Sequence, residues 1–553
     1  MTAIDETVTP VLARTQLFEG VDQAQLREAA SLMRRRTFEA RDTICRRGDP
    51  GGSLFIIVEG LAHVLVGEGD RVEDTVARLR RGDVVGEMSL LTGEPRSATV
   101  VAGLPTTVLE LDPQAFGALV TREPAILSNL TQILSRRLSG MLRSRAEQRG
   151  EAVALVVAPS CDHLRKDALA ATKAQSVRPV TVLDARESVD SALAHLEAAL
   201  LESGTVILVA DAGQEELPHL RDHVDRVVIV ATAEEADAVP LPNAQLVLAG
   251  GGAAAGFDVV RTIDRAGNSR DIGWLGRHLA RTKLGLALGA GGAKGYAHVG
   301  ALYVLEEAGY TVDYVAGSSI GAIVGAWLGM GKNAAQVDET MRHAFSPDRV
   351  EEMFKLSFSG ASSGLDVTTE IFRETTEDKT FDDLEVPVVV MTVDLVTRSP
   401  APITEGPLWQ ALLAATALAG MFPPYERDAQ RLVDGLALVP VPTGAVVEAG
   451  ADVTLSVNII SPETLPAWPG QTELPEAPPS RKGSRMLDTI LEVMDVAQMD
   501  ASVRHAALAD VVVTPRFGPG SWRDFHLADL FLEAGRQAAR DQIRLLQALA
   551  RPA

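Results

Sequence analysis

The sequence is poor in cysteine, in aromatic residues and in positive charge. Its two cysteines, Cys45 and Cys161, lie among 553 residues and in regions of different pattern. A disulfide framework is therefore excluded, and a reducing compartment is expected. Lysine and arginine number 52 against 74 acidic residues, which makes the formal net charge −22. This acidic balance disfavours tight binding to nucleic acid or to anionic lipid surfaces.

Long apolar stretches are also missing. No run is long enough and free of breakers to cross a bilayer. Residues 1–10 are acidic and lack the basic and apolar parts of a secretion signal. We therefore expect a cytoplasmic protein. Transient contact with a membrane surface is compatible with this location. The length leaves room for three or four domains, each with its own core.

Two consecutive strand–turn–helix units carry glycine-rich turns. The first turn, residues 289–295, follows the apolar run 284–288, and the second, residues 317–321, follows the largely apolar run 312–316. A glycine-rich turn before a helix directs backbone amides and the positive end of the helix at an anion. The second turn reads Gly-Ser-Ser-Ile-Gly and is typical of a nucleophile elbow, which presents a serine hydroxyl at a strand tip. Together the turns predict acyl transfer by Ser319.

Each turn by itself is a weak signal. Short Gly-x-Ser-x-Gly strings occur by chance, and glycine-rich loops also serve dinucleotide folds and P-loops. The first turn lacks the Gly-Lys-Ser/Thr ending of a P-loop, and Ala290 interrupts the spacing of a dinucleotide fingerprint. Two correctly framed turns in successive units are much harder to obtain by accident.

Three segments resemble the patatin-like phospholipase family in order and spacing. They are residues 288–300, the Ser319 elbow and the Leu432-Val-Asp434-Gly435 stretch. The resemblance implies a Ser-Asp dyad, with Ser319 as nucleophile and Asp434 as the base, and neither cofactor nor metal for catalysis. It also assigns the oxyanion hole and the glycines of the elbow to the following residues: Gly291, Gly292, Ala293 and Lys294 for the hole, and Gly317 and Gly321 for the elbow.

The chain departs from this family at two positions beside the predicted site. Leu436 replaces the usual small residue after Asp434-Gly435, and Ala290 replaces a glycine of the oxyanion loop. A side chain at either position would be strained if its backbone required a positive φ angle. Such strain would slow turnover or would indicate a decayed hydrolase domain that serves as a nucleotide-responsive scaffold.

An ordinary Ser-Asp-His triad is the competing catalytic hypothesis. It needs a histidine after Asp434, and His505 and His526 are the two candidates. His505 lies in a polar helical run and His526 at a predicted helix start, so both are typical of surface or packing residues. We interpret His298, just after the first glycine-rich turn, as packing or loop support.

An independent motif lies near the N-terminus. Residues 17–112 show short apolar runs separated by turn signals, which predicts an all-β domain with flanking helices. Within it, residues 86–100 closely resemble the phosphate-binding cassette of cyclic-nucleotide-binding domains. The resemblance implies that Glu87 binds the ribose hydroxyl and Arg96 the cyclic phosphate. Further contacts are expected from Gly86, Met88, Ser89 and Ser97. We favour cAMP over cGMP; a β-roll that binds nothing is the alternative.

A helix with one apolar stripe is predicted at residues 125–150, and it suits either a dimer contact or packing onto its own β-roll. No helix-turn-helix or basic face follows, which argues against a DNA-binding regulator. Instead, buried strand-like runs alternate with helical stretches across residues 151–280. They predict a small parallel Rossmann-like α/β domain without a ligand of its own.

The order of these regions resembles the neuropathy target esterase family and its bacterial relatives. We predict a multidomain α/β protein: a β-roll at 1–124, a connecting helix at 125–150, a parallel α/β domain at 151–280 and a patatin-like α/β/α domain at 281–553. The implied activity is hydrolysis of phospholipid or lysophospholipid acyl esters under cyclic-nucleotide control. Residues 345–372 are expected to line an acyl tunnel, to form a lid or to be a plain surface loop.

Overall fold

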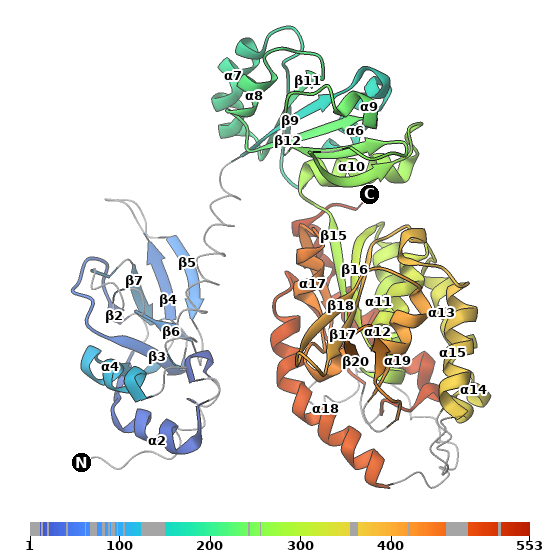
Figure 1. The fold of residues 1–553 in the computed structure, drawn as a ribbon. Coiled ribbons are helices and arrows are strands. Elements are labelled where there is room, and N and C mark those ends of the chain that lie inside the picture. Colours follow the sequence, from blue (N-terminus) through green and yellow to red (C-terminus); the bar gives the residue numbers. More distant parts are fainter. Residues whose placement is uncertain are drawn as a thin grey trace. The chain divides into compact units, whose positions relative to one another are not determined.

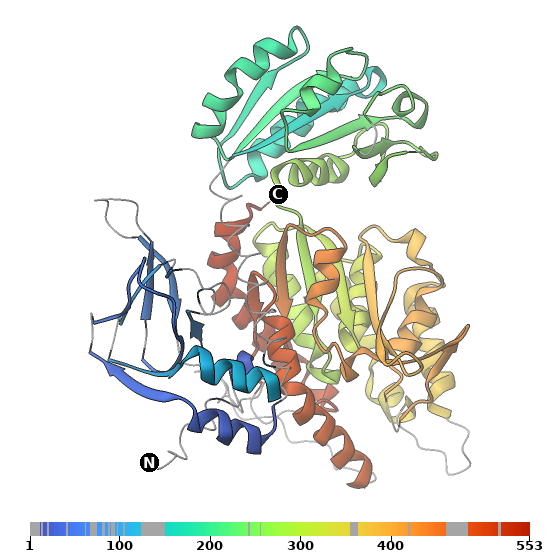
Figure 2. The same ribbon diagram turned by 60° about the vertical axis from the view of Figure 1, so that its left-hand side comes forward.

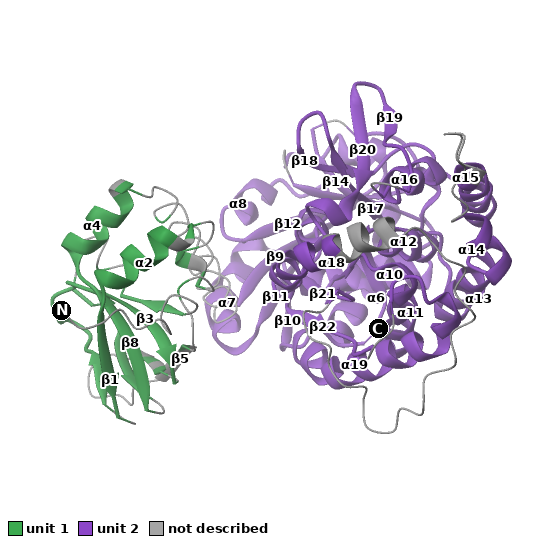
Figure 3. Ribbon diagram, turned by 90° about the horizontal axis from the view of Figure 1, so that it is seen from below, with its two compact units in different colours: residues 1–148 green, residues 149–553 purple. Residues whose placement is uncertain are grey.

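The computed structural model describes four stretches of the chain. They are residues 12–126 except 13–14, 19–20, 40–41, 61, 67–73, 80–82, 87–88, 90–94, 97, 103–104 and 123–125; residues 150–353 except 242–243 and 255; residues 363–460 except 419–420; and residues 485–552 except 518–520. The predicted helix at 125–150 therefore lies almost wholly outside the described residues. The chain divides into two compact units, Met1–Gln148 and Arg149–Ala553 (Figure 3).

The first unit is the β-roll that the sequence predicted. Two four-stranded antiparallel sheets, in the orders β1-β8-β3-β6 and β2-β7-β4-β5, form it. Its elements are α2 (Gln23–Ser31), β1 (Arg34–Phe38), β2 (Thr43–Cys45), β3 (Leu54–Glu59), β4 (Ala62–Val66), β5 (Asp74–Leu79), β6 (Val84–Val85), β7 (Thr99–Ala102), β8 (Thr106–Leu111) and α4 (Pro113–Arg122). Strand β3 is buried on both faces, because Leu54 and Ile56 join one core while Phe55 and Ile57 join the other.

The second unit begins with a six-stranded parallel sheet in the order β10-β11-β9-β12-β13-β14. Its elements are β9 (Glu151–Val157), α6 (Asp162–Gln175), β10 (Val180–Asp184), α7 (Val189–Glu202), β11 (Thr205–Asp211), α8 (Leu217–Arg221), β12 (Arg226–Ala231), α9 (Ala233–Ala236), β13 (Gln245–Ala249), β14 (Asp258–Ile263) and α10 (Ser269–Ala280). Helices α7 and α8 cover one face, and α6 and α10 cover the other (Figure 1). The buried strand-like runs of the sequence correspond to the first four strands in chain order, β9 to β12. The sequence analysis did not predict β13 or the more exposed edge strand β14.

A second sheet of the same unit carries the glycine-rich turns. Within the described residues its order is β19-β20-β17-β16-β15-β21-β22, and β18 pairs with β17. The strands are β15 (Leu284–Leu288), β16 (Val312–Ser318), β17 (Val388–Asp394), β18 (Ser399–Ile403), β19 (Tyr425–Arg427), β20 (Gln430–Asp434), β21 (Val453–Val457) and β22 (Val511–Val513). Strands β15, β16, β17, β21 and β22 are parallel, so the turns after β15 and β16 lie at the same edge of the sheet.

Helices cover both faces of this sheet (Figures 1 and 2). They are α11 (Tyr296–Glu307), α12 (Ile320–Gly329), α13 (Ala334–Ala344), α14 (Pro347–Met353), α15 (Ser363–Thr376), α16 (Leu408–Ala415), α17 (Thr443–Glu448), α18 (Arg485–Ala506) and α19 (Ala528–Leu549). Leu286 and Leu288 point into the main core with α11, α12 and α19, whereas Ala287 faces α17. No helix among the described residues is both long and apolar enough to cross a membrane.

A buried ion pair joins α10 to the second sheet. The guanidinium of Arg277 binds both carboxylate oxygens of Asp313, at 2.8 and 2.9 Å, and both side chains are almost fully buried. The same carboxylate accepts the amide of Leu284 at 3.0 Å. One aspartate therefore ties α10 to the beginnings of β15 and β16.

We expect Arg277→Met to destabilise the second unit by about 3–5 kcal/mol, because it leaves the Asp313 charge buried and unpaired. Urea unfolding of the full chain measures this change. The matched control is Arg540→Met, whose partner Glu533 lies on the exposed face of α19 and whose loss should cost less than about 1 kcal/mol. The double variant Arg277→Met/Asp313→Leu should recover much of the lost stability; equal effects of the two single substitutions would contradict this prediction.

Candidate active site

The turn after β15 adopts backbone conformations that require glycine. Gly291 has a φ of 157° and Gly292 a φ of 58°, and the second value lies in the left-handed region. A short 3₁₀ turn, Gly292–Gly295, then leads directly into α11. Gly291 and Gly292 line a pocket, and neither amide donates a turn, loop or cap hydrogen bond to a described backbone carbonyl.

Two of the four amides expected in the oxyanion hole point elsewhere. The amide of Ala293 donates to the carbonyl oxygen of Trp522 at 2.7 Å, and the amide of Lys294 donates to Gly291 at 3.3 Å. Neither residue lines the pocket. In this structure tertiary and local hydrogen bonds therefore occupy two of the four expected donors. Gly291 and Gly292 remain as the loop's available donors.

The turn after β16 is a sharp elbow. Ser319, the residue just before α12, has φ 54° and ψ −123°, a strained conformation for a residue with a side chain. Two glycines make the bend possible, because an added Cβ on Gly317 would overlap the carbonyl of Gly321, and one on Gly321 would overlap that of Leu288. The Ser319 side chain consequently reaches the pocket at the N-terminus of a helix, where the first amides lack intrahelical partners.

Asp434 lies at the end of β20 and lines the same pocket as Ser319. Its Oδ1 accepts the amide of Leu436 at 2.8 Å. Burial raises the pKa of this carboxyl from 3.8 to about 6, against the opposing effect of hydrogen bonding from the Ser319 side chain. Such a pKa suits a group that must accept a proton near neutral pH.

The two departures from the family pattern carry no backbone strain. Neither Ala290 nor Leu436 is among the described residues with a positive φ. Leu436 lies in a short 3₁₀ turn after Asp434, and together with Ala290 and Ile460 it forms a small buried apolar cluster. The strain that a positive φ would have imposed is therefore absent.

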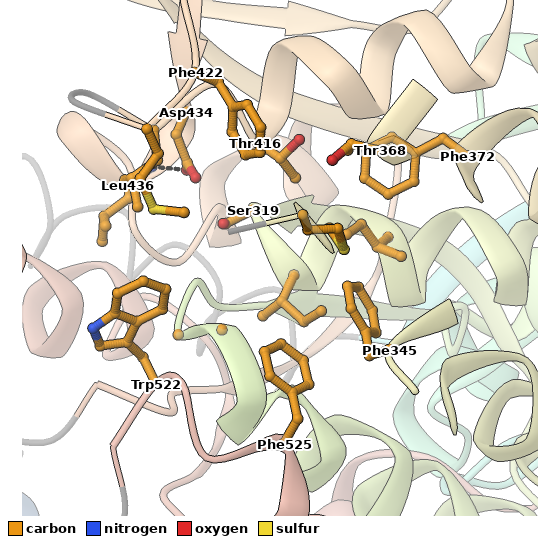
Figure 4. Close-up of a pocket in the computed structure, with 17 residues that line it drawn as sticks. Ser319, Phe345, Thr368, Phe372, Thr416, Phe422, Asp434, Leu436, Trp522 and Phe525 are labelled. Carbon is orange, nitrogen blue, oxygen red and sulfur yellow. Dashed lines mark hydrogen bonds between the residues drawn. The ribbon is translucent and has the colours of Figure 1, made fainter. Parts of the chain in front are cut away.

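The pocket is almost entirely apolar (Figure 4). Besides Gly291, Gly292, Ser319 and Asp434, its lining comprises Ile320, Ile323, Phe345, Met353, Thr368, Phe372, Thr416, Leu418, Met421, Phe422, Leu436, Trp522 and Phe525. Of these, Phe345, Met353 and Phe372 are buried, whereas Met421, Phe422 and Trp522 are partly exposed. A chain of methylene groups fits such a cavity, because its walls offer dispersion contacts and few hydrogen bonds.

The structure describes residues 345–372 in part. Within them, Phe345, Met353, Thr368 and Phe372 line the pocket. Residues 354–362, the remainder of the expected tunnel or lid, lie outside the described residues. Trp522, Phe525 and Phe422 were not anticipated as pocket residues, because their sequence surroundings carry no motif.

No described histidine lines the pocket. His526 is exposed on a short turn, and His505 lies near the end of α18. His298 is fully buried, and its Nε2 lies 2.8 Å from the carbonyl oxygen of Gly289. Burial lowers the pKa of His298 to about 4, so the neutral ring donates to that carbonyl and supports the oxyanion loop.

The predicted nucleotide site in the first unit is described in part. Arg96 is buried, and its guanidinium donates to the carbonyls of Gly86 at 3.2 Å and Ser53 at 2.7 Å. The backbone of Arg96 pairs with the turn at Gly48 and Asp49. Ser89 is also buried, and its hydroxyl lies 3.4 Å from the carbonyl of Pro95. The other predicted contacts, Glu87, Met88 and Ser97, lie outside the described residues.

The segments that contain the Ser319 pocket and the predicted nucleotide site each match the model of a known protein family. Residues 286–447 match the model described as patatin-like phospholipase, and residues 35–123 match the model of the cyclic nucleotide-binding domain. An uncharacterised NTE family protein of Mycobacterium tuberculosis is 24% identical over 564 residues, covering 96% of this chain and 95% of its own length. Human patatin-like phospholipase domain-containing protein 6 is 24% identical over 517 residues, covering 76% of this chain and 37% of its own length.

Among solved structures, a cyclic nucleotide-binding domain from Methylobacillus flagellatus is 27% identical, with a TM-score of 0.23, and covers 25% of this chain and 78% of its own. The two model matches and the similarity to the mycobacterial protein agree with the order of regions read from the sequence. The chain therefore carries a cyclic nucleotide-binding domain and a patatin-like phospholipase domain, and it is related along nearly its whole length to proteins named as the NTE family.

Proposed function

We propose that this protein is a serine esterase that hydrolyses acyl esters of phospholipids or lysophospholipids through a dyad of Ser319 and Asp434. The observation that carries the proposal is that a strained elbow serine and a buried carboxyl with a raised pKa line one apolar pocket. The acyl chain would occupy the buried end beside Phe345 and Phe372. The polar part of the substrate would remain toward the partly exposed residues.

In this mechanism the hydroxyl oxygen of Ser319 attacks the ester carbonyl while Asp434 takes its proton. The developing oxyanion receives hydrogen bonds from the amides of Gly291 and Gly292 and is stabilised by the N-terminus of α12. Asp434 then returns the proton to the departing alkoxide. Water repeats the sequence on the acyl-enzyme, with Asp434 as base, and releases the fatty acid. No cofactor or metal is required.

Both rival hypotheses lose their main support. The triad needs a histidine in contact with the base, and none of the described residues lining the pocket is a histidine. The scaffold hypothesis rested on strain at Ala290 and Leu436, which have no positive φ.

The direct test of the proposed function is to measure hydrolysis of a panel of lysophospholipids and short nitrophenyl esters by the wild type and by Ser319→Ala. No turnover by the wild type on any substrate would favour the scaffold.

We further propose that a cyclic nucleotide, cAMP rather than cGMP, binds the first unit and regulates the esterase. Gly86, Glu87, Met88, Ser89, Arg96 and Ser97 would hold it, as the match to the cyclic nucleotide-binding model suggests. Regulation requires that the nucleotide bind active and inactive arrangements with different affinity.

We also propose a cytoplasmic location, transient membrane contact for access to lipid, and a dimer through residues 125–150. Nucleic acid is not proposed as a partner, because the chain is strongly acidic.

Arg96→Gln should weaken cAMP binding roughly 10- to 100-fold, because a charged hydrogen bond to the phosphate is lost. Calorimetry with cAMP and cGMP measures the affinity. Saturating cAMP should change wild-type hydrolysis some 5- to 150-fold if the coupling has the usual size of about 1–3 kcal/mol. Arg122→Gln, on the exposed face of α4, is the control and should bind normally. Unchanged binding in Arg96→Gln, or hydrolysis indifferent to both nucleotides, would count against regulation at this site.

A further inference from the structure

The wall of the pocket includes residues far outside the segment that matches the patatin-like model. That segment ends at residue 447, whereas Trp522 and Phe525 line the pocket. In Figure 4 both side chains lie on one side of Ser319, while Thr416 and Phe372 lie on the other. The C-terminal part of the chain therefore completes the cavity in which Ser319 lies.

Trp522 also contacts the oxyanion loop through its backbone. Its carbonyl oxygen accepts the amide of Ala293 at 2.7 Å. Gly292 lies directly against the same residue, so that a Cβ at Gly292 would collide with the Trp522 backbone. The hydrogen bond occupies the Ala293 amide, whereas the two preceding residues, Gly291 and Gly292, line the pocket.

Trp522 lies shortly before one of two closely packed helices. Helix α19 begins six residues after Trp522 and crosses α11, which begins directly after the oxyanion loop. Glycines make this crossing close, because an added Cβ on Gly300 would overlap the carbonyl of Leu532, and one on Gly535 would overlap that of Ala297. At the far end of α19, the hydroxyl of Tyr310 donates to the carbonyl of Ala550 at 2.9 Å.

We propose that Trp522 is a positioning residue for the oxyanion hole, and that α19, through its close crossing with α11, sets the position of Trp522. This inference rests on the proposed esterase function. The amides of Gly291 and Gly292 belong to a loop in which Gly292 adopts a left-handed backbone conformation. The direction of these two amides therefore depends on the contacts that hold the loop. Trp522 supplies such a contact from the segment just before α19, and α19 packs on α11, the helix that follows the loop. An oxyanion donor is worth about 10²–10³ in turnover, and a displacement near 1 Å can cost about 10²-fold.

Two substitutions in the full chain test the inference. Gly535→Ala pushes α19 away from Ala297 and leaves every pocket residue intact. Trp522→Gly removes the indole and loosens the backbone that carries the carbonyl. The controls are Gly444→Ala, whose added Cβ on α17 meets no atom within 4 Å, and Trp409→Gly, a residue outside the pocket lining.

Three measurements are made on each variant: kcat and KM for a nitrophenyl ester, affinity for an alkyl boronic acid, and affinity for an ether analogue of a lysophospholipid. The boronic acid forms a tetrahedral anion on the serine oxygen and so reports on the oxyanion hole, whereas the ether reports on ground-state binding. We expect Gly535→Ala to lower kcat and boronate affinity together, by about 10- to 100-fold, and to change ether affinity less than about threefold. Trp522→Gly should lower boronate affinity at least tenfold more than ether affinity.

A folded Gly535→Ala variant with normal kcat, or one in which kcat falls while boronate affinity is unchanged, would overturn the inference. If Gly535→Ala does not fold, the comparison of boronate and ether in Trp522→Gly decides. Failure of the proposed function is a different result: ester turnover by the wild type that survives Ser319→Ala.

Discussion

Replacing Ser319 by alanine should reduce ester hydrolysis by about 10⁴- to 10⁶-fold, the largest effect expected from any single substitution in this chain. The alanine retains the cavity and the two loop amides but has no oxygen to form the acyl-enzyme. In hydrolases with a comparable nucleophile, removal of that group costs about this much, and the remaining rate comes from the oxyanion hole and substrate binding. Steady-state hydrolysis of a lysophospholipid, followed by fatty acid release, measures the loss.

The adjacent serine provides a matched control. Ser318 is fully buried, its hydroxyl donates to the carbonyl of Val439 at 2.6 Å, and it does not line the pocket. Ser318→Ala should therefore lose about 1 kcal/mol of stability and keep turnover within about tenfold of the wild type. The assignment of the nucleophile would be wrong if Ser319→Ala retained activity comparable to that of Ser318→Ala.

The second large effect is expected from Asp434→Asn, which should lower kcat by about 10⁴-fold, as loss of the assisting carboxylate does in related mechanisms. An amide of the same shape preserves the acceptor for the Leu436 amide but cannot take the proton of Ser319. In the wild type the base must be ionised, and burial raises the pKa of Asp434 to about 6. The ratio kcat/KM should consequently rise about tenfold per pH unit below pH 6 and level off above it.

Asp394 serves as the control for this pH profile. It lies on the neighbouring strand β17 and is also buried, but the backbone amide of Val396 and other donors lower its pKa. Its ionisation cannot produce a limb near pH 6. Asp394→Asn should therefore leave the midpoint of the profile in place, even where it lowers stability. A midpoint near pH 6 that persisted in Asp434→Asn would assign the limb to another group.

The raised pKa of Asp434 also has a stability cost of defined sign. Between about pH 4 and pH 6 the folded protein holds a proton that the unfolded chain has released, so stability falls as pH rises through this window. The cost is absent below pH 4 and complete above pH 6. Asp434→Asn removes it, and from pH 5 to pH 8 the variant should gain about 1–2 kcal/mol relative to the wild type. Melting temperatures measured in parallel at the two pH values test this gain; a relative loss would contradict the raised pKa.

Local sequence was sufficient to predict the features that depend on neighbouring residues. The strand, glycine turn and helix around Gly291 and around Ser319 follow from an apolar run, residues that permit the bend and the start of an apolar helix. The β-roll was likewise readable from short apolar runs between turn signals. The role of Asp434, at the end of the short strand β20, came instead from the family resemblance.

Tertiary structure decided which groups meet and which backbone conformations they adopt. Whether Ala290 and Leu436 were strained depended on φ angles that packing against Ile460 and the adjoining turns sets. The diversion of the Ala293 amide depended on a carbonyl 229 positions further along, at Trp522. Trp522 reaches the loop because Gly300 and Gly535 allow two helices to cross closely. Contacts of this kind arise from complementary shape across the fold, and no local pattern near Trp522 encodes them.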